Sequence, residues 1–247
     1  MAEIEFRSDM TVELVRASAA DSDVLFAARV STVGEQSLQQ DIDSREGEQS
    51  EQTSKRNAGL INYLMRDRHG SPFEHNSMTF YVQAPIFVFR EFMRHRIASY
   101  NEESGRYREL RPVFYVPGPE RNLVQQGKPG KYDFVPGTAE QFGLVEQEVR
   151  TNSRRAYESY EKMLAADVAR EVARMVLPLN IYSSMYVTMN ARSLMNFLSL
   201  RTKRPDSRFP SFPQREIEMV AEKMEAIWMD LMPLTSAAFE KNGRVAP

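Results

Sequence analysis

Residues 77–96 read SMTFYVQAPIFVFREFMRHR and combine two kinds of element in one short stretch. Residues 77–83 are rich in β-forming side chains and predict a strand. Pro85 then suits the first turn of a helix, because its fixed φ is already helical and its missing N–H is not needed there. The stretch therefore predicts a strand that runs directly into an apolar helix over 85–96, which ends in the cationic run Arg-His-Arg.

Similar signals continue on both sides of this stretch. Polarity patterns predict further strands at 12–17, near 113–116 and at 180–189, and further helices at 20–31, 54–68, 138–165, 169–177, 191–201 and 214–231. Several Pro and Gly residues within 112–137 predict that the strand near 113–116 is followed by a surface loop. There is no regular βαβ rhythm and no GxGxxG, which argues against a Rossmann fold. We predict a single α+β domain over residues 1–247, with a mixed or antiparallel sheet and long helices.

Two segments lack the periodicity of a helix or strand. Residues 34–53 are rich in Gln, Glu and Ser, and we expect a mobile loop there. Residues 203–213, KRPDSRFPSFP, contain too many prolines for regular structure.

The overall composition excludes several classes of protein. Of the 247 residues 42% are hydrophobic, which indicates a globular chain with a real core. The apolar runs are too short to cross a bilayer and no signal-peptide pattern begins the chain, so we expect a cytoplasmic protein without membrane contact. A net charge of −2 argues against a nucleic acid as substrate. The absence of cysteine excludes disulfides, thiolate metal sites and thiolate nucleophiles, so the chemistry needs another group or a cofactor.

Residues 94–107, RHRIASYNEESGRY, carry the densest group of polar side chains. Cations at the end of a helix can simply complement its dipole. That reading does not account for six arginines between 90 and 111, because clustered guanidinium groups repel one another unless an anion lies among them. Arginine is also a preferred partner of phosphate. This stretch therefore favours an anion site suited to a small phosphorylated ligand.

Other chemical readings of the polar residues are weaker. His69, Glu74 and His75 flank a proline turn, but their spacing matches no standard metal site, so no metal is expected. Ser104 has no GxSxG surroundings and no adjacent base that would make it a nucleophile. Glu102 and Glu103 are neighbours whose side chains diverge, so they do not predict a carboxylate pair.

A second motif, NARSLMNFLSLR at 190–201, predicts an amphipathic helix with Leu194, Phe197 and Leu198 buried. Its polar side offers two asparagines and two arginines. These groups provide both donors and acceptors, as the edge of a heteroaromatic ligand requires.

These blocks together resemble the flavin-dependent thymidylate synthases. The signature of that family, RHR followed by seven residues and Ser, matches Arg94-His95-Arg96 and Ser104. The resemblance continues through AARVS (27–31), HGSPFEH (69–75), APIFVFREFMRHRIASYNEESGRY (84–107), AREVARMVLPLN (169–180) and NARSLMNFLSLR (190–201). It covers roughly residues 12–201 in blocks and is less clear beyond them.

The resemblance implies a homotetramer whose active sites are shared between subunits, with FAD at the interfaces. For FAD it implies Ser31, Ser71, Arg94, His95, Arg96, Glu102, Asn190, Arg192 and Asn196. For the substrate dUMP it implies Glu91, Phe92, Met93, Arg94, Glu102, Glu103, Ser104, Gly105, Arg106, Arg174 and Arg201. The catalytic residue is expected to be Arg201, which would stabilise negative charge on the uracil ring, and Ser104 is assigned to binding.

The implied reaction is the methylation of dUMP to dTMP. Methylenetetrahydrofolate would supply the carbon, and NADPH would reduce the flavin. Unrelated thymidylate synthases attack uracil with a cysteine thiolate, and the absence of cysteine here agrees with chemistry carried by a flavin. The resemblance identifies no folate-binding residue.

The sequence departs from the family pattern at two places. Glu91 stands where some members carry Gln, which affects a hydrogen bond to the nucleotide. After Arg201 many members have a short segment with a histidine, whereas residues 203–218, KRPDSRFPSFPQREIE, are longer and contain none.

Two other functions fit some of the same residues. One is an RNA- or nucleotide-binding module that uses the arginines with Tyr100 and Tyr107 for stacking, although the net acidity argues against it. The other is a different flavin oxidoreductase, which would oxidise NADPH without making dTMP.

Overall fold

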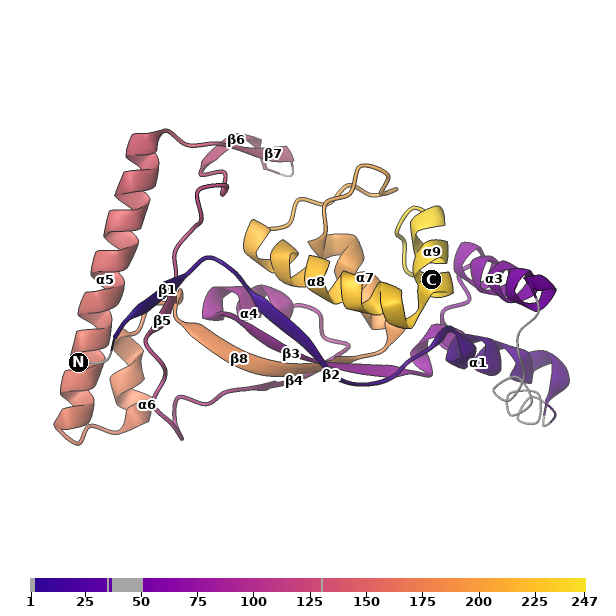
Figure 1. Cartoon of the computed structure of the whole chain (residues 1–247), viewed down its shortest axis with the longest axis horizontal. Coiled ribbons are helices and arrows are strands. Elements are labelled where there is room, and N and C mark those ends of the chain that lie inside the picture. The colour runs from indigo at the N-terminus through magenta and orange to yellow at the C-terminus, as the bar shows by residue number, and fades with distance from the viewer. Residues whose placement is uncertain (1–2, 35, 37–50, 130) are drawn as a thin grey trace.

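The computed structural model describes residues 3–34, 36, 51–129 and 131–247 (Figure 1). Its strands are β1 Glu5–Arg7, β2 Thr11–Ser18, β3 Ser77–Pro85, β4 Ser99–Glu102, β5 Val113–Tyr115, β6 Val124–Lys128, β7 Lys131–Val135 and β8 Tyr182–Met189. Its helices are α1 Asp21–Val33, α3 Glu51–Arg66, α4 Ile86–Phe92, α5 Ala139–Ala165, α6 Arg170–Ala173, α7 Ala191–Arg201, α8 Arg215–Leu231 and α9 Pro233–Lys241, with 3₁₀ turns η1 at Ser71–Glu74 and η2 at Arg174–Val176.

The centre of the molecule is a four-stranded antiparallel sheet in the order β2-β3-β8-β4. In its register Phe80 lies opposite Val187, and Glu102 lies opposite Met185. A separate parallel pair joins β1 to β5, and β6 and β7 form a hairpin. The predicted α+β class and the mixed and antiparallel pairing are confirmed.

Helices α4, α7 and α8 cover one face of this sheet (Figure 1). Alternate strand residues such as Phe80, Val82 and Val187 are fully buried beneath them. On the opposite face Tyr186 is half exposed and meets Tyr81 edge to face, with ring centroids 6.0 Å apart. Among the described residues, Figure 1 shows no helix over the middle of that second face.

The long helix α5 builds a second, smaller core at one end of the sheet. Tyr157 and Tyr160 are buried there with Phe114 of β5. The Tyr157 hydroxyl donates to the carbonyl of Leu110 at 3.0 Å, and the N–H of Leu110 donates to the Tyr160 hydroxyl at 3.3 Å. These bonds fix the chain that leaves β4, which carries several candidate site residues.

The elements with long periodic patterns agree with the sequence prediction. This holds for the strands at β2, β3 and β8 and for the helices α5, α7 and α8. The segment 203–213 contains no helix or strand, as predicted. No helix in the part of the chain that the structure describes is long and apolar enough to span a membrane.

Several shorter elements were predicted wrongly or missed. The helix expected over 85–96 ends at Phe92, so Arg-His-Arg lies in the following turn. The expected helix at 169–177 is only α6 followed by η2. Strands β1 and β4 and helix α9 had no prediction, and the stretch up to residue 137 that was expected to be a surface loop contains the hairpin of β6 and β7. Main-chain hydrogen bonds to distant strands stabilise β1 and β4, and side-chain periodicity does not encode those bonds.

The predicted loop at 34–53 is mostly untested, because 35 and 37–50 lie outside the described residues. Its last three residues, 51–53, belong to α3, so that boundary was wrong. Glu51 begins the helix and forms an ion pair with Lys55 one turn later, at 2.7 Å.

Candidate active site

The turn that follows α4 presents the Arg-His-Arg motif. The hydroxyl of Tyr100 on β4 donates to the carbonyls of His95 at 2.6 Å and Phe92 at 3.1 Å, which fixes this turn to the sheet. Arg94 and Arg96 are exposed, and neither forms an ion pair with any described residue. Two adjacent free guanidinium groups are therefore held on a rigid turn and can accept an anion.

Arg201, the last residue of α7, lies against this turn. Its Nε donates to Nε2 of His95 at 3.0 Å, and its Nη1 donates to Oε2 of Glu91 at 2.5 Å. Nη2 also reaches the carbonyl oxygen of Glu91 at 3.2 Å. The Arg201 side chain is only 11% exposed. The structure thus brings together the predicted catalytic residue and two predicted ligand residues that are more than 100 positions distant in the sequence.

His95 is neutral in this arrangement. Its Nε2 accepts the bond from Arg201, and its ring packs edge to face on Phe197 at 4.9 Å between centroids. Burial, followed by the positive charge of Arg201, lowers the pKa of His95 to about 4, although Glu91 opposes the shift. The motif therefore carries two charges at neutral pH, and reading His95 as a third cation was wrong.

A second group of candidate residues lies where β4 ends. A cavity of about 290 Å³ is lined by Glu102, Glu103, Gly105 and Arg174 together with Ser183 of β8. Burial raises the pKa of Glu102, and the charge of Glu103 adds to this shift while that of Arg174 opposes it. The cavity thus combines a half-buried carboxyl group with an arginine that forms no ion pair with any residue the structure describes.

Gly105 permits the close packing of this cavity. A Cβ atom at Gly105 would lie 3.2 Å from Cδ of Arg174 and 3.2 Å from a side-chain carbon of Leu110. The hydroxyl of Ser104 accepts from the N–H of Arg106 at 3.3 Å, so this serine stabilises the turn. Arg106 itself pairs with Glu171 through Nε at 2.8 Å, and both side chains are about half exposed.

Glu103, Phe92 and Met93 have different surroundings. Glu103 pairs with Arg108 at 2.9 Å and accepts from the Ser184 hydroxyl at 3.2 Å. Phe92 is fully buried and stacks on Phe197, and its carbonyl already accepts from Tyr100 and from the N–H of His95, so it underlies the turn and is not itself exposed. Met93 is 41% exposed.

The remaining candidate residues lie around the start of α7. Asn190 caps this helix by accepting from the N–H of Ser193 at 2.9 Å, and Asn196 donates to the carbonyl of Arg192 at 3.1 Å. Arg192 pairs with Glu74 at 2.5 Å. A Cβ atom at Gly70 would lie 2.5 Å from Cζ of Arg192, so only glycine allows the guanidinium to approach.

Ser71 lies in η1 and Ser31 lies in α1, and these two elements pack against each other. Both serines are exposed. These helical elements are at the opposite end of the long axis from α6, which immediately precedes Arg174 (Figure 1). One chain therefore distributes its candidate residues over separate regions.

The turn that holds His69 and Glu74 has a packing role. His69 stacks on Tyr63 with centroids 5.6 Å apart, and Glu74 is occupied by Arg192. Within the described ranges no three His, Asp or Glu side chains are placed to hold a metal ion.

Three residues of this region were not identified from the sequence as part of the site. Tyr100 fixes the Arg-His-Arg turn, Gly70 admits Arg192, and Ser183 lines the cavity. Tyr100 and Gly70 lie inside the sequence blocks that resemble the family, so their place in those blocks was the signal that could have identified them. Ser183 lies in a predicted strand and carries no local signal.

Comparison with known proteins agrees with this fold. The family model described as thymidylate synthase complementing protein matches residues 13–234. The flavin-dependent thymidylate synthase of Streptomyces coelicolor is 67% identical over 99% of this chain and 96% of its own length. Crystal structures of the UMP/dUMP methylase PolB from Streptomyces cacaoi, bound with 5-Br UMP or 5-Br dUMP, superpose with TM-scores of 0.88 and 0.89 at 53% identity, covering 99% of this chain and 100% of theirs.

The α+β fold, the arginine-rich site and these similarities together define an enzyme of the methyltransferase class. Within that class, the chain belongs to the flavin-dependent thymidylate synthase family. The family resemblance drawn from the sequence blocks is therefore confirmed.

Proposed function

We propose that this enzyme converts dUMP to dTMP by reductive methylation, with FAD as its cofactor and NADPH and 5,10-methylenetetrahydrofolate as co-substrates. When bound, reduced FAD supplies the hydride, and the folate supplies the carbon. The observation that carries the proposal is the guanidinium of Arg201 held between Glu91 and His95, beside the turn of Arg94 and Arg96, which have no carboxylate partner among the described residues. Because phosphorylated nucleotides do not cross a bilayer unaided, we place the reaction in the cytoplasm.

The described residues fit an anionic flavin nucleotide. Arg94 and Arg96 have no carboxylate partner within the described chain. Gly70 has no side chain, and this leaves room for the guanidinium of Arg192. We propose that these arginines hold the pyrophosphate and that Asn190 and Asn196 offer amide groups to the ring edges. Ser31, Ser71, His95 and Glu102 complete the proposed FAD set.

The cavity at the end of β4 suits the nucleotide substrate. We assign to its phosphate the positive charge of Arg174, which lines the cavity, and of Arg106, which pairs with the lining residue Glu171. Glu102, whose pKa is raised by burial, offers its half-buried carboxyl group to a ligand in this cavity. We assign Glu91, Phe92, Met93, Glu103 and Ser104 to the walls of the same substrate site.

Arg201 is the proposed catalytic residue. Its side chain is largely shielded from water, and its guanidinium is a planar cation held in a fixed position. Such a fixed cation stabilises negative charge that develops on the uracil ring more strongly than it would in water. The neutral ring of His95 orients Nε without adding a competing charge.

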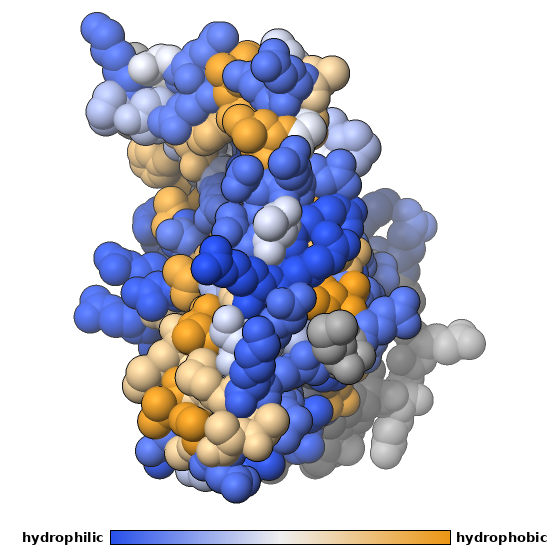
Figure 2. Space-filling model, turned by 90° about the vertical axis from the view of Figure 1, so that its left-hand side faces the viewer, coloured by the Kyte–Doolittle hydropathy of each residue, from blue (hydrophilic) through white to orange (hydrophobic). Residues whose placement is uncertain are grey.

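We propose further that the enzyme is a homotetramer with active sites shared between subunits. The separation of α1 from α6 supports this, because residues at both ends are assigned to one site. The half-exposed outer sheet face offers one contact surface. Val172, Met175, Val176 and Leu179 are 42–77% exposed beside Arg174, and Figure 2 shows hydrophobic atoms gathered toward the lower edge of this end of the molecule.

The reaction can be tested directly. The purified protein should bind FAD and show the flavin absorbance band. An anaerobic mixture with NADPH, dUMP and methylenetetrahydrofolate should then yield dTMP. A protein that takes up no flavin would favour the RNA- or nucleotide-binding module, and NADPH oxidation without dTMP would indicate another oxidoreductase. Replacing dUMP with UMP would establish whether the ribose 2′-hydroxyl is rejected.

Sharing of the site can be tested by mixing two inactive variants. Arg174→Ala and Arg201→Ala, each inactive alone, would be dissociated together and reassembled. If the two arginines of one site come from different subunits, about a quarter of the sites regain both residues and activity returns. No recovery from a correctly reassembled mixture would contradict the shared arrangement.

A further inference from the structure

The segment that follows α9, residues 243–247, contacts both ends of α7. At the C-terminal end of this helix, Nη2 of Arg244 donates to Oγ1 of Thr202 at 2.7 Å. At the N-terminal end, Nε of Arg192 donates to the main-chain oxygen of Pro247 at 2.6 Å. One short segment therefore supports the helix that carries the second motif.

Thr202, the residue next to Arg201, is fully buried and uses all its polar atoms. Its N–H and its hydroxyl both donate to the carbonyl of Leu198, at 3.0 and 2.7 Å. Its own carbonyl accepts from the hydroxyl of Ser211 at 2.5 Å, and its hydroxyl accepts from Arg244. These four bonds fix the last turn of α7, from which the Arg201 side chain extends.

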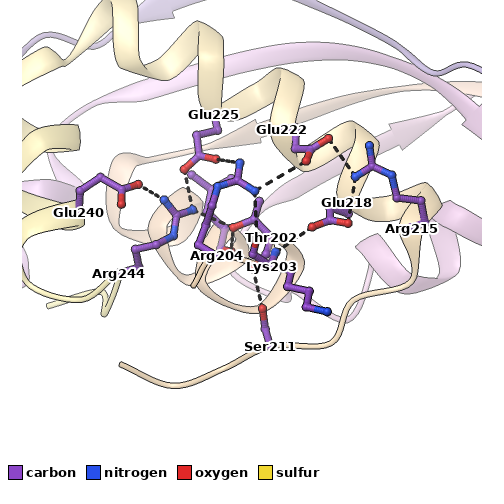
Figure 3. Close-up of polar contacts among 11 residues, drawn as sticks. Thr202, Lys203, Arg204, Ser211, Arg215, Glu218, Glu222, Glu225, Glu240 and Arg244 are labelled. Carbon is purple, nitrogen blue, oxygen red and sulfur yellow. Dashed lines mark hydrogen bonds and ion pairs between the residues drawn. The ribbon is translucent and has the colours of Figure 1, made fainter. Parts of the chain in front are cut away.

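Arg244 is held as firmly as the threonine that it contacts (Figure 3). Its side chain is 1% exposed and pairs with Oε1 of Glu225 at 2.6 Å and with Glu240. Its guanidinium lies 5.0 Å from the ring centroid of Phe239. Glu225 is shared with Arg204 at 2.9 Å, so the buried charges form a connected network on α8. A buried cation with this many partners has little freedom to move.

The main chain at Arg244 adds a further sign of constraint. Its φ is 58°, in the left-handed region that non-glycine residues rarely adopt. Its N–H donates to the carbonyl of Phe239 at 2.9 Å. Such a conformation persists only where the surroundings enforce it, and here it directs the side chain toward Thr202.

We propose that Arg244 is a positioning residue for the reaction. Through Thr202 it holds the C-terminal turn of α7 and thereby keeps the guanidinium of Arg201 against His95 and Glu91. Arg244 does not contact either of these two residues. The proposal rests on the role assigned to Arg201 in the proposed function, so the test must distinguish the positioning role of Arg244 from the catalytic role of Arg201.

The kinetic test compares Thr202→Val with Arg244→Met at a temperature where both variants are folded. Valine keeps the shape of threonine but removes the hydroxyl, and each change should lower kcat about tenfold while FAD remains bound. The double variant should lose little more than either single one, because both act through one link. If Arg244→Met does not fold, Thr202→Val alone still decides the question.

Arg215→Met is the matched control. Arg215 pairs with Glu218 at 2.9 Å and Glu222 at 3.1 Å in the same charged surface, but does not contact Thr202 (Figure 3). The kcat of Arg215→Met should stay unchanged, even if the melting temperature of this variant falls. An equal loss of kcat in this control would show a general effect of stability and would overturn the proposal.

A second readout does not depend on turnover. The charge of Arg201 helps to lower the pKa of His95, after burial, while Glu91 raises it; the Phe197 ring also packs against His95. In histidine-labelled Thr202→Val, NMR titration should find the pKa of His95 displaced upward from about 4. An unchanged pKa together with unchanged kcat would refute the positioning role. Arg201→Ala, assayed in parallel, tests the proposed function separately: full activity there would refute the catalytic role of Arg201, whereas the pKa of His95 in Thr202→Val still tests the positioning.

Discussion

Arg201 donates a hydrogen bond from Nε to Nε2 of His95 at 3.0 Å, although the two residues are 106 positions apart in the chain. The bond requires that the imidazole accept at this nitrogen, so its ring proton lies on Nδ1. The turn of the signature motif and the end of α7 are therefore joined through a neutral histidine. This relationship determines how positive charge is distributed at the proposed active site.

The low pKa of His95 should make stability depend on pH. An unfolded histidine has a pKa of about 6.5, whereas His95 has a pKa of about 4 in the folded chain. Below pH 6.5 the unfolded state therefore binds more protons, and the stability present above that pH is lost progressively toward pH 4. Allowing for partial exposure, we expect the free energy of unfolding to fall by about 1 kcal/mol between pH 7 and pH 5. Urea titrations of the protein and of His95→Gln should differ by this amount; parallel pH slopes would contradict it.

Arg201→Ala should abolish dTMP formation, with a loss in kcat of at least about 100-fold, because no other fixed cation replaces its charge. Flavin content, measured by absorbance, should remain normal. Near-normal turnover in this variant would refute the catalytic role.

Glu91→Gln should strengthen the binding of dUMP. A glutamine oxygen can still accept the bond from Nη1 of Arg201, which now measures 2.5 Å, but it no longer neutralises the guanidinium. We expect the KM for dUMP to fall about two- to fivefold, since the pair is partly exposed. The pKa of His95 should also fall, because Glu91 raises it. A higher KM would mean that the carboxylate itself binds the nucleotide.

Ser104→Ala should weaken the binding of dUMP without removing activity. The Ser104 hydroxyl accepts from the N–H of Arg106, and Nε2 of His95 is already occupied by Arg201, so that nitrogen does not activate the serine. Loss of one such bond should raise the KM about fivefold. Complete loss of turnover at saturating dUMP would instead support a nucleophilic serine.

Gly105→Ala should disturb the substrate cavity through packing. The new methyl group would lie 3.2 Å from Arg174 and from Leu110, so the arginine must move. We expect a KM for dUMP raised several-fold and a stability loss of about 1 kcal/mol. Gly143→Ala in α5 is the matched control, since apart from its chain neighbours and the backbone of its own helix no atom of the described residues lies within 4 Å of its new Cβ; it should leave KM unchanged and stabilise the helix by about 0.5–1 kcal/mol.

The sequence alone determined the larger elements and the family. Strand β3 and helix α7 follow from side-chain patterns within short windows, because one buried face imposes its own period on each element. The signature from Arg94 to Ser104 and the lack of cysteine similarly indicated flavin-dependent chemistry before any contact was known.

Only the tertiary structure decided what those residues do to one another. Strand β4 exists because β8 supplies its hydrogen bonds, and His95 is neutral because burial and Arg201 make its charged form unfavourable. The support of Thr202 by Arg244 likewise joins segments 42 residues apart. Local patterns record which face of an element is buried. Electrostatic and hydrogen-bond partners, in contrast, depend on which distant segments the folded chain brings within a few ångströms.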